Sequence, residues 1–284
     1  MARITNIKKH PNADTLVIVK VDDLDYQIVA KDIFTLGQEV AFFPIDTVFS
    51  EKAAAHYGVK RIKTIKLRGE ISQGMIAPID EFALEPVTKY EDEVVDAGSM
   101  TLRGLPDGIS VYKIESAQKV KFDFDFIHVT EKLEGTNAIF TNNMACSHRR
   151  KVDPGNNLYW RMHEKYNLSR LPDGYILRGE IIGPKVQNNY YGLKENELRA
   201  FDIETKEGYL EPFEAELMCE ALNVPVVPKI FAGHINAFLL GDTLVNKSNG
   251  TSLLVNKLRE GIVIKSLFNP RLIAKVRSPE YLCG

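Results

Sequence analysis

The sequence predicts an α+β protein of two domains, a small β-barrel over residues 1–100 and a larger domain over residues 101–284. The chain of 284 residues is long for one hydrophobic core and suits two. Short strand-like runs fill its first third, and the remainder alternates such runs with loops and one helical pattern. Between the two parts, residues 86–115 contain the turn-forming residues that are typical of an interdomain boundary, namely Pro86, Gly98, Gly104, Pro106 and Gly108.

In the first domain, three short runs rich in branched and aromatic residues are strand candidates, at 16–21, 26–30 and 38–43. Turn residues separate these runs, among them Asp22 and Gly37. Strands this short and this closely spaced favour a small closed barrel, and an OB fold is the first choice. The stretch 53–57 is expected to be a short helix that ends at Gly58.

In the second domain, one helix is expected from Pro212 to Leu222. Its apolar residues at 213, 217, 218, 221 and 222 predict an amphipathic stripe that faces the core. Strand candidates lie on both sides of this helix, at 126–130, 175–182, 199–203, 261–266 and 271–276.

Composition limits the classes of protein that the chain can represent. With 44 % hydrophobic and 26 % charged residues it is an ordinary globular chain. Its net charge of −2 means that any nucleic-acid contact must depend on local basic patches. Cys146, Cys219 and Cys283 lack C-x-x-C spacing and are expected to be free thiols, without a zinc site or disulfides. Because no apolar signal region or membrane span is visible, we expect a soluble cytoplasmic protein with no membrane partner.

The most informative segment contains Lys132, followed at the third position by Gly135 in a K-x-x-G pattern. Such a lysine could attack a nucleotide phosphate. A free lysine has a pKa near ~10.4, so burial, nearby cations or a metal ion must lower the pKa before the amine can attack. Gly135 is expected to let the chain turn sharply through a positive φ. On its own the pattern favours a solvated lysine in a turn.

Four later segments give this pattern its meaning. They follow in the order Arg178-Gly179-Glu180, Phe201-Asp202-Ile203, Glu260 to Lys265, and Ala274-Lys275-Val276-Arg277. Together with Lys132 they resemble the signature of covalent nucleotidyltransferases, the superfamily of DNA ligases, RNA ligases and mRNA capping enzymes. The Gly-Thr-Asn after the lysine and the preceding domain are most similar to the fifth RNA ligase family. The resemblance implies an ATP-grasp-like nucleotidyltransferase domain, with antiparallel sheets and flanking helices, over residues 101–284.

The resemblance also implies a role for each matching residue around the adenosine of ATP. Lys132 would form the lysyl-AMP bond, and Asn137 would help to orient the lysine side chain. Glu131 would contact adenine, Glu180 the ribose hydroxyls, and Phe201 would stack on the base. The alternatives are a turn-forming asparagine, a surface pair of Arg178 with Glu180, and a core phenylalanine.

Around the phosphates, the resemblance implies that Glu260 binds Mg²⁺ or Mn²⁺, because a carboxylate suits a hard divalent cation. Lys265, Lys275 and Arg277 would supply positive charge beside the triphosphate. Arg277 replaces the second lysine of the family's usual K-x-K, which keeps the charge on a group that stays protonated. Structural salt bridges are the competing interpretation.

A basic segment follows the lysine by about 15 residues, as a serine–arginine motif does in ligases. Either Arg149 or Arg150 is expected to hold the ribose or a phosphate, unless this is simply a solvated loop. No general-base histidine is needed, so His128, His148 and His163 are expected to be structural.

A second basic cluster lies in the first domain and contains Lys60, Arg61, Lys63, Lys66 and Arg68. Its charges alternate with branched residues, so on a strand one face would be cationic and the other buried. Residues 67–75 resemble a segment of the N-terminal domains of the fifth RNA ligase family. The cluster is expected to contact the phosphate backbone of a nicked duplex, although a solvated strand face is an alternative.

Together these observations predict an ATP-dependent RNA ligase that seals nicked RNA or an RNA-containing duplex as a monomer. Most DNA ligases and capping enzymes carry a trailing OB domain, and with only a few residues after Arg277 we expect none here. The alternatives are a capping-type guanylyltransferase that uses GTP, and a catalytically inert OB-fold protein that binds nucleic acid.

Overall fold

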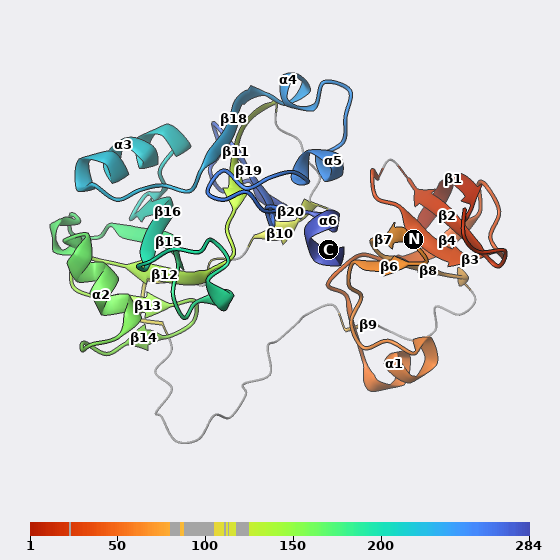
Figure 1. Ribbon diagram of the computed structural model, residues 1–284, viewed down its shortest axis with the longest axis horizontal. Helices are drawn as coiled ribbons and strands as arrows, with labels where there is room; N and C mark the ends of the chain where they lie inside the picture. Colours follow the sequence, from red (N-terminus) through yellow and green to blue (C-terminus); the bar gives the residue numbers. More distant parts are fainter. Residues whose placement is uncertain (23, 80–85, 88–104, 111, 113, 118–124) are drawn as a thin grey trace.

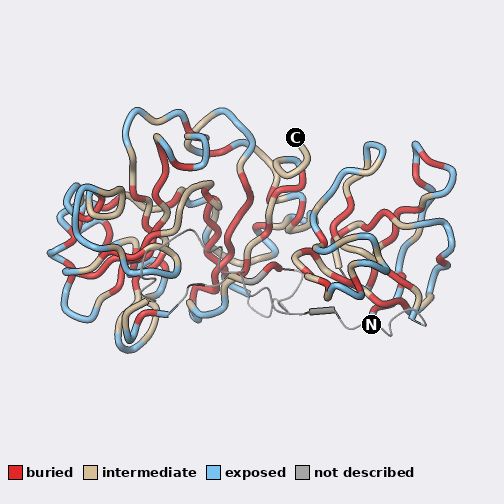
Figure 2. The backbone as a smooth tube through the Cα atoms, turned by 90° about the horizontal axis from the view of Figure 1, so that it is seen from below, coloured by how far each residue is buried: buried red, intermediate tan, exposed pale blue. Residues whose placement is uncertain are grey.

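The computed structural model describes residues 1–22, 24–79, 86–87, 105–110, 112, 114–117 and 125–284. They form an N-terminal region and a larger C-terminal region (Figure 1). Most of the expected boundary segment, residues 86–115, lies outside the described residues. Buried residues follow the strands of both regions, whereas many connecting loops are exposed (Figure 2).

The N-terminal region is built on a five-stranded antiparallel sheet with the order β3-β2-β1-β4-β8. All three expected strands are present, with small shifts at their ends. The short helix α1 (Glu51–Tyr57) ends at Gly58, which takes the left-handed conformation as expected. The five strands are β1 (Ala2–Lys9), β2 (Leu16–Val21), β3 (Ile28–Lys31), β4 (Glu39–Phe43) and β8 (Met75–Ala77).

A small hairpin carries two residues of the basic cluster, Lys66 and Arg68. Strands β6 (Ile65–Leu67) and β7 (Glu70–Ser72) are joined by Arg68 and Gly69, whose φ angles of 48° and 96° are both positive. That is the geometry of a type I′ turn, which matches the twist of a two-stranded hairpin. Within the cluster only Ile65–Leu67 is strand, and Ile65 is 46 % exposed, so this strand does not have the buried apolar face that a strand was expected to show. A further short pair joins β5 (Val48–Phe49) and β9 (Pro86–Val87).

The C-terminal region contains two sheets. The first has the order β10-β20-β19-β11-β18 and is antiparallel except for the parallel pair β10 and β20. The second has the order β14-β13-β12-β15-β16-β17 and is antiparallel. The first sheet consists of β10 (Glu115–Ser116), β11 (Phe126–Lys132), β18 (Lys229–His234), β19 (Gly261–Ser266) and β20 (Ile273–Arg277). The second consists of β12 (Thr136–Phe140), β13 (Ala145–Ser147), β14 (Lys151–Val152), β15 (Ile176–Ile182), β16 (Glu197–Thr205) and β17 (Gly208–Tyr209).

Helices flank the two sheets. All five strands expected in this region are found, within a few residues at their ends. The helices are α2 (Leu158–Lys165), α3 (Pro212–Leu222), α4 (Ile235–Leu239), α5 (Leu244–Ser248) and α6 (Pro279–Cys283), with 3₁₀ turns at Leu168–Arg170 and Gln187–Asn189.

Helix α3 has the expected bounds but only part of the expected buried face. Phe213 and Leu217 are 51 % and 68 % exposed, so these two positions of the predicted stripe were wrong. Leu222 is buried as predicted, and Met218 packs against the core. The buried face also carries Pro212, Ala215 and Cys219.

The fold bears on the expectations for the cysteines and for membrane spans. The three cysteines are free, with Cys146 and Cys219 buried. Within the described ranges, no helix is both long enough and apolar enough to cross a membrane.

Candidate active site

Lys132 lies where the two sheets of the C-terminal region meet. It is the last residue of β11, and the chain then crosses through Leu133, Glu134 and Gly135 into β12 of the other sheet. Within its own sheet, Lys132 is paired with Gly261 at the start of β19. This register brings Lys132 next to Glu260, although the two are far apart in the sequence.

Gly135 is required by close packing rather than by its backbone angle. Its φ angle is not positive, so the expectation of a positive φ was wrong. A Cβ at this position would lie 2.5 Å from the carbonyl oxygen of Ile181 and 2.6 Å from Cγ of Glu180. The missing side chain therefore lets the connection pass close to β15.

A carboxylate connects the lysine to an arginine. Lys132 Nζ lies 2.7 Å from Glu260 Oε2, and Arg277 Nε lies 3.4 Å from Glu260 Oε1. The second distance is an ion-pair distance without hydrogen-bond alignment. Gly261 has a φ of 154°, and a Cβ there would lie 2.2 Å from the carbonyl oxygen of Val276. That glycine allows β19 to approach β20 and brings Glu260 and Arg277 together.

The opposite wall comes from the second sheet. Asn137 on β12 is paired in register with Glu180 on β15. Burial is the main cause that raises the pKa of Glu180 to about 8; Lys132 opposes this shift and Glu260 adds to it. Within the described part of the chain, the buried Oδ1 of Asn137 has no hydrogen-bond partner. An acceptor left in this state at a cavity wall suits a ligand that brings its own donor or cation.

A large cavity opens on one side of Lys132. It encloses about 770 Å³, including its open mouth, and its walls are partly apolar. Phe201 contributes an aromatic face, supported by Tyr112, whose ring centroid lies 5.1 Å away at an angle of 36°. The polar lining includes Lys132, Asn137, His148, Glu180 and Lys275. A cavity with one aromatic wall and polar groups opposite suits a nucleoside.

A second cavity opens on the other side of the lysine. It encloses about 520 Å³ and is lined almost entirely by polar groups. Lys132, Leu133 and Glu180 border both cavities. The other residues that line it are Glu134, Gly135, Gln187, Glu260, Arg277 and Tyr281. The amine of Lys132 therefore lies between a space suited to a base and a space suited to charged groups.

Lys265 is buried and holds the aromatic wall in place. Its Nζ donates a hydrogen bond to the carbonyl oxygen of Phe201 and another, at 2.6 Å, to Asp202 Oδ1. The Tyr112 hydroxyl donates to the other oxygen of Asp202. Sequence reasoning placed Lys265 beside the triphosphate, assigned no role to Asp202 and overlooked Tyr112. The charge of Asp202, alternating with apolar residues along β16, was the available signal.

Three further residues of the motifs are buried or line the larger cavity. Arg178 is fully buried and pairs with Glu204 at 2.5 Å, so the alternative of a surface pair with Glu180 was wrong. Glu131 is buried, and its Oε2 accepts a hydrogen bond from the Leu253 backbone at 2.7 Å. Lys275 lines the larger cavity.

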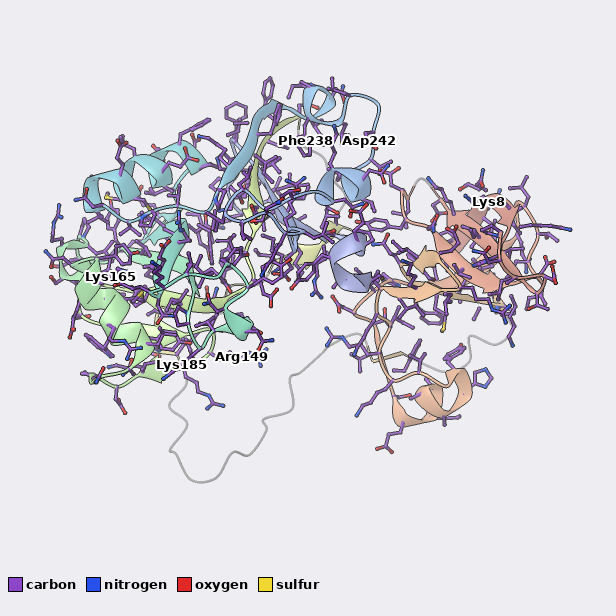
Figure 3. All side chains as sticks on the ribbon, in the orientation of Figure 1. Lys8, Arg149, Lys165, Lys185, Phe238 and Asp242 are labelled. Carbon is purple, nitrogen blue, oxygen red and sulfur yellow. The ribbon has the colours of Figure 1, made fainter. Side chains whose placement is uncertain are left out.

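The basic loop after β13 places a histidine, rather than an arginine, at the cavity. His148 lines the larger cavity, whereas Arg149 and Arg150 are exposed and are not among its lining residues. The side chain of Arg149 is labelled in Figure 3. His128 bonds to Glu216 at 2.8 Å and His163 to the Thr141 carbonyl oxygen at 3.0 Å, which are structural roles. Sequence reasoning also overlooked Glu134, Gln187 and Tyr281 in the polar cavity. Of these, Glu134 was visible inside the K-x-x-G segment itself.

Comparison with known proteins follows the same division of the chain. An RNA ligase family model matches residues 125–277, which is more than half of the sequence. The chain belongs to the RNA ligase family. An OB-fold domain model matches residues 1–79 of the ligase. The resemblance and the fold class expected from the sequence are thus confirmed.

Solved structures agree with this assignment at the level of the fold. Naegleria gruberi RNA ligase with pyrophosphate is 24 % identical with a TM-score of 0.79, covering 99 % of this chain and 96 % of that one. A mutant of the same enzyme with ATP and manganese is 23 % identical with a TM-score of 0.79, covering 99 % and 97 %. Another mutant, with AMP and manganese, is 22 % identical with a TM-score of 0.75, covering 99 % and 96 %. No curated protein sequence matches the chain.

Glu180 makes the stability of the nucleotide-free ligase depend on pH. Its pKa is raised from 4.5 to about 8, so the folded state keeps a proton that the unfolded state loses between these values. The stability that comes from the protonated carboxyl is complete below pH 4.5 and is lost as the pH rises through about 8. We expect Glu180→Gln to melt with the wild type near the acidic end and several degrees above it at about pH 9.

Melting temperatures measured across this range by differential scanning fluorimetry would check the prediction. The exposed Glu207→Gln serves as the control, and its difference from the wild type should not vary with pH. A Glu180→Gln difference that stays constant with pH would contradict the raised pKa.

Proposed function

We propose that the protein is an ATP-dependent RNA ligase that joins 3′-hydroxyl and 5′-phosphate ends at nicks. The reaction would pass through a lysyl-AMP on Lys132 and an adenylylated 5′ end. The observation that supports this most directly is the position of the Lys132 amine, between a cavity with an aromatic wall and a polar cavity with a carboxylate and an arginine. An α-phosphate at that junction would lie within reach of the amine.

In this proposal the larger cavity holds the adenosine. Phe201 offers a face for stacking on the base, and Lys265 and Tyr112 keep that face in position. Glu180 faces the ribose hydroxyls, and its raised pKa lets a neutral carboxyl both donate and accept a hydrogen bond. Arg149 or Arg150 is proposed to reach the nucleotide from the loop beside His148.

The phosphates are proposed to extend toward the polar side. Lys275 and Arg277 lie on the same strand, β20, and each lines one of the two cavities. Their charges would favour binding of the triphosphate and departure of pyrophosphate. Glu260 holds the amine of Lys132 at 2.7 Å, which fixes the direction of the nucleophile. After AMP transfer, the same cations would serve the two later steps.

A divalent cation fits the residues of this site. Within the described ranges no group of three or more possible ligands is already close enough to enclose a metal ion. The cavities nevertheless offer carboxylates at Glu134, Glu180 and Glu260, and the Asn137 oxygen, which has no hydrogen-bond partner among the residues that the structure describes. Such an oxygen-rich set, with room for water, suits Mg²⁺ or Mn²⁺. When bound, the cation would offset the charge that develops on the attacked phosphate.

The test of the proposed function is the choice and fate of the nucleotide. Purified protein would be incubated in parallel with ATP and GTP, each radiolabelled at the α-phosphate. We expect an acid-stable label on the protein from ATP, followed by sealing of a nicked RNA duplex. Label from GTP alone would identify a capping-type enzyme instead. No label from either nucleotide would favour an inert binding protein.

We further propose that the basic cluster of the N-terminal region, on the hairpin and in the segment just before it, contacts the RNA backbone. Lys60, Lys63, Lys66 and Arg68 are exposed, while Arg61 is held by Asp46 at 2.7 Å. Asn12 donates to the carbonyl oxygen of Arg68 and fixes the turn. Exposed cations on a fixed backbone suit phosphate contacts that do not depend on base sequence.

Replacing Lys66 and Arg68 by alanine is expected to weaken binding of a nicked duplex while leaving lysine adenylylation within about twofold of the wild type. Each lost phosphate contact should lower the magnitude of the salt slope of log K by roughly 0.9. Binding titrations at several salt concentrations would measure this slope. The exposed Lys8 and Lys52 of the same region, mutated together to alanine, provide a charge-matched control. Equal losses of binding and adenylylation would contradict a separate role for the hairpin.

A further inference from the structure

Helix α6 is anchored to the backbone of the active site. Ser278 precedes this helix and is fully buried. Its N–H donates to the carbonyl oxygen of Glu260 at 2.9 Å, and its hydroxyl donates to Asn249 Oδ1 at 2.8 Å. The same hydroxyl accepts the Tyr281 N–H at 3.1 Å, which caps the helix. The start of the helix is therefore hydrogen-bonded to the backbone of Glu260, the residue whose carboxylate holds Lys132.

The anchored helix directs Tyr281 into the polar cavity, where its hydroxyl donates a hydrogen bond to Glu134 Oε2. The ring of Tyr281 packs against the edge of Tyr190, with centroids 5.6 Å apart at an angle of 75°. The backbone N–H of Glu134 donates to the hydroxyl of Tyr191 at 2.7 Å. Glu134 is thus held at its backbone by one tyrosine and at its carboxylate by another.

Electrostatics explains why this carboxylate needs a donor. Glu134 lies in the same cavity as Glu260, and two carboxylates in one cavity repel each other. Without the phenol, the side chain of Glu134 would be free to turn away from Glu260. With the phenol, it stays beside the pair of Lys132 and Glu260, where the proposed transfer takes place.

We propose that Tyr281 is a positioning residue for lysine adenylylation, acting through the Glu134 carboxylate. The proposal rests on the proposed function and adds α6 to the machinery of the site. Helix α6 also lies beside β6, the strand that carries Lys66 (Figure 1). Helix α6 is thus a neighbour both of the proposed RNA-binding hairpin and of the Glu134 carboxylate.

The test is Tyr281→Phe, which keeps the ring that packs on Tyr190 and removes the hydroxyl. We expect the single-turnover rate of lysyl-AMP formation at saturating ATP to fall roughly tenfold, because a hydrogen bond to a charged group is lost. The KM for ATP should change by less than about twofold, since the base and ribose contacts remain. The melting temperature should stay close to that of the wild type. Tyr175→Phe, which removes a hydroxyl elsewhere in the region, should keep the wild-type rate.

A double-mutant cycle separates this role from a general loss of structure. Glu134→Ala removes the carboxylate that accepts the hydrogen bond from the phenol. If Tyr281 acts through Glu134, adding Tyr281→Phe to that variant should slow the reaction by less than about twofold. A full further loss in the alanine background, or a wild-type rate in the single Tyr281→Phe variant, would overturn the proposal. Absence of lysyl-AMP from the wild-type protein would instead refute the proposed function.

Discussion

Lys132→Ala is expected to abolish the radiolabelled protein–AMP adduct, because alanine has no amine with which to attack the α-phosphate. The fold should persist, since the Lys132 side chain is partly exposed and its partner Glu260 keeps Arg277 nearby. The same variant should still seal a nick whose 5′ end is already adenylylated, because that step needs the cations and not the nucleophile. Gel detection of label on the protein and of sealed product would measure both activities.

The control for this variant is Lys194→Ala, which removes an exposed lysine of the same region and should keep the adduct. An adduct that survives in Lys132→Ala would show that another residue is the nucleophile. Loss of both adduct formation and sealing of the adenylylated nick, with an unchanged melting temperature, would mean that the lysine also serves the last step.

Asp202→Ala is expected to cause the largest loss of stability. Asp202 and Lys265 form a buried pair in which the side chains are 3 % and 5 % exposed. Removing the carboxylate leaves the ammonium of Lys265 buried without its counter-charge, which costs about 3–5 kcal/mol. For a region of this size, the melting temperature should fall by roughly 6–20 °C. Nucleotide affinity should fall as well, because Lys265 and Tyr112 then no longer hold Phe201.

Calorimetry of Asp202→Ala would measure the loss of stability. The exposed Asp153→Ala provides a matched control and should melt within about 1 °C of the wild type. Asp202→Asn should lie between them, because the amide keeps hydrogen-bonding capacity but loses the charge. A melting temperature of Asp202→Ala near that of the wild type would show that the pair contributes little.

The pattern of apolar residues along the chain predicted a strand well where the whole run is buried. The run 261–266 is strand β19 with all six residues buried, as a continuous apolar run predicts. Helix α3 shows where the pattern fails, because apolar residues lie on more than one side of it. Phe213 and Leu217 then suggested the wrong face, and only the tertiary packing selects Ala215 and Cys219.

The site shows a similar division. The ordered motifs were enough to place Lys132, Glu180 and Glu260 around one junction, since the sheet register brings them together. The contact of Tyr281 with Glu134 joins residues 147 positions apart and belongs to no motif, so no local signal could reveal it. The reason for a glycine at position 135 could not be read locally either, because the backbone of β15 that it approaches is more than 40 residues away along the chain.

The crossing of the chain at Leu133–Gly135 has a mechanical consequence. One sheet carries Lys132, Lys275 and Arg277, while the other carries Asn137, Glu180 and Phe201. A nucleotide that lies on Phe201 and reaches Arg277 would bridge the two sheets, which this short connection joins. The bound nucleotide would then partly determine the angle between the sheets, and release of each product would remove that constraint.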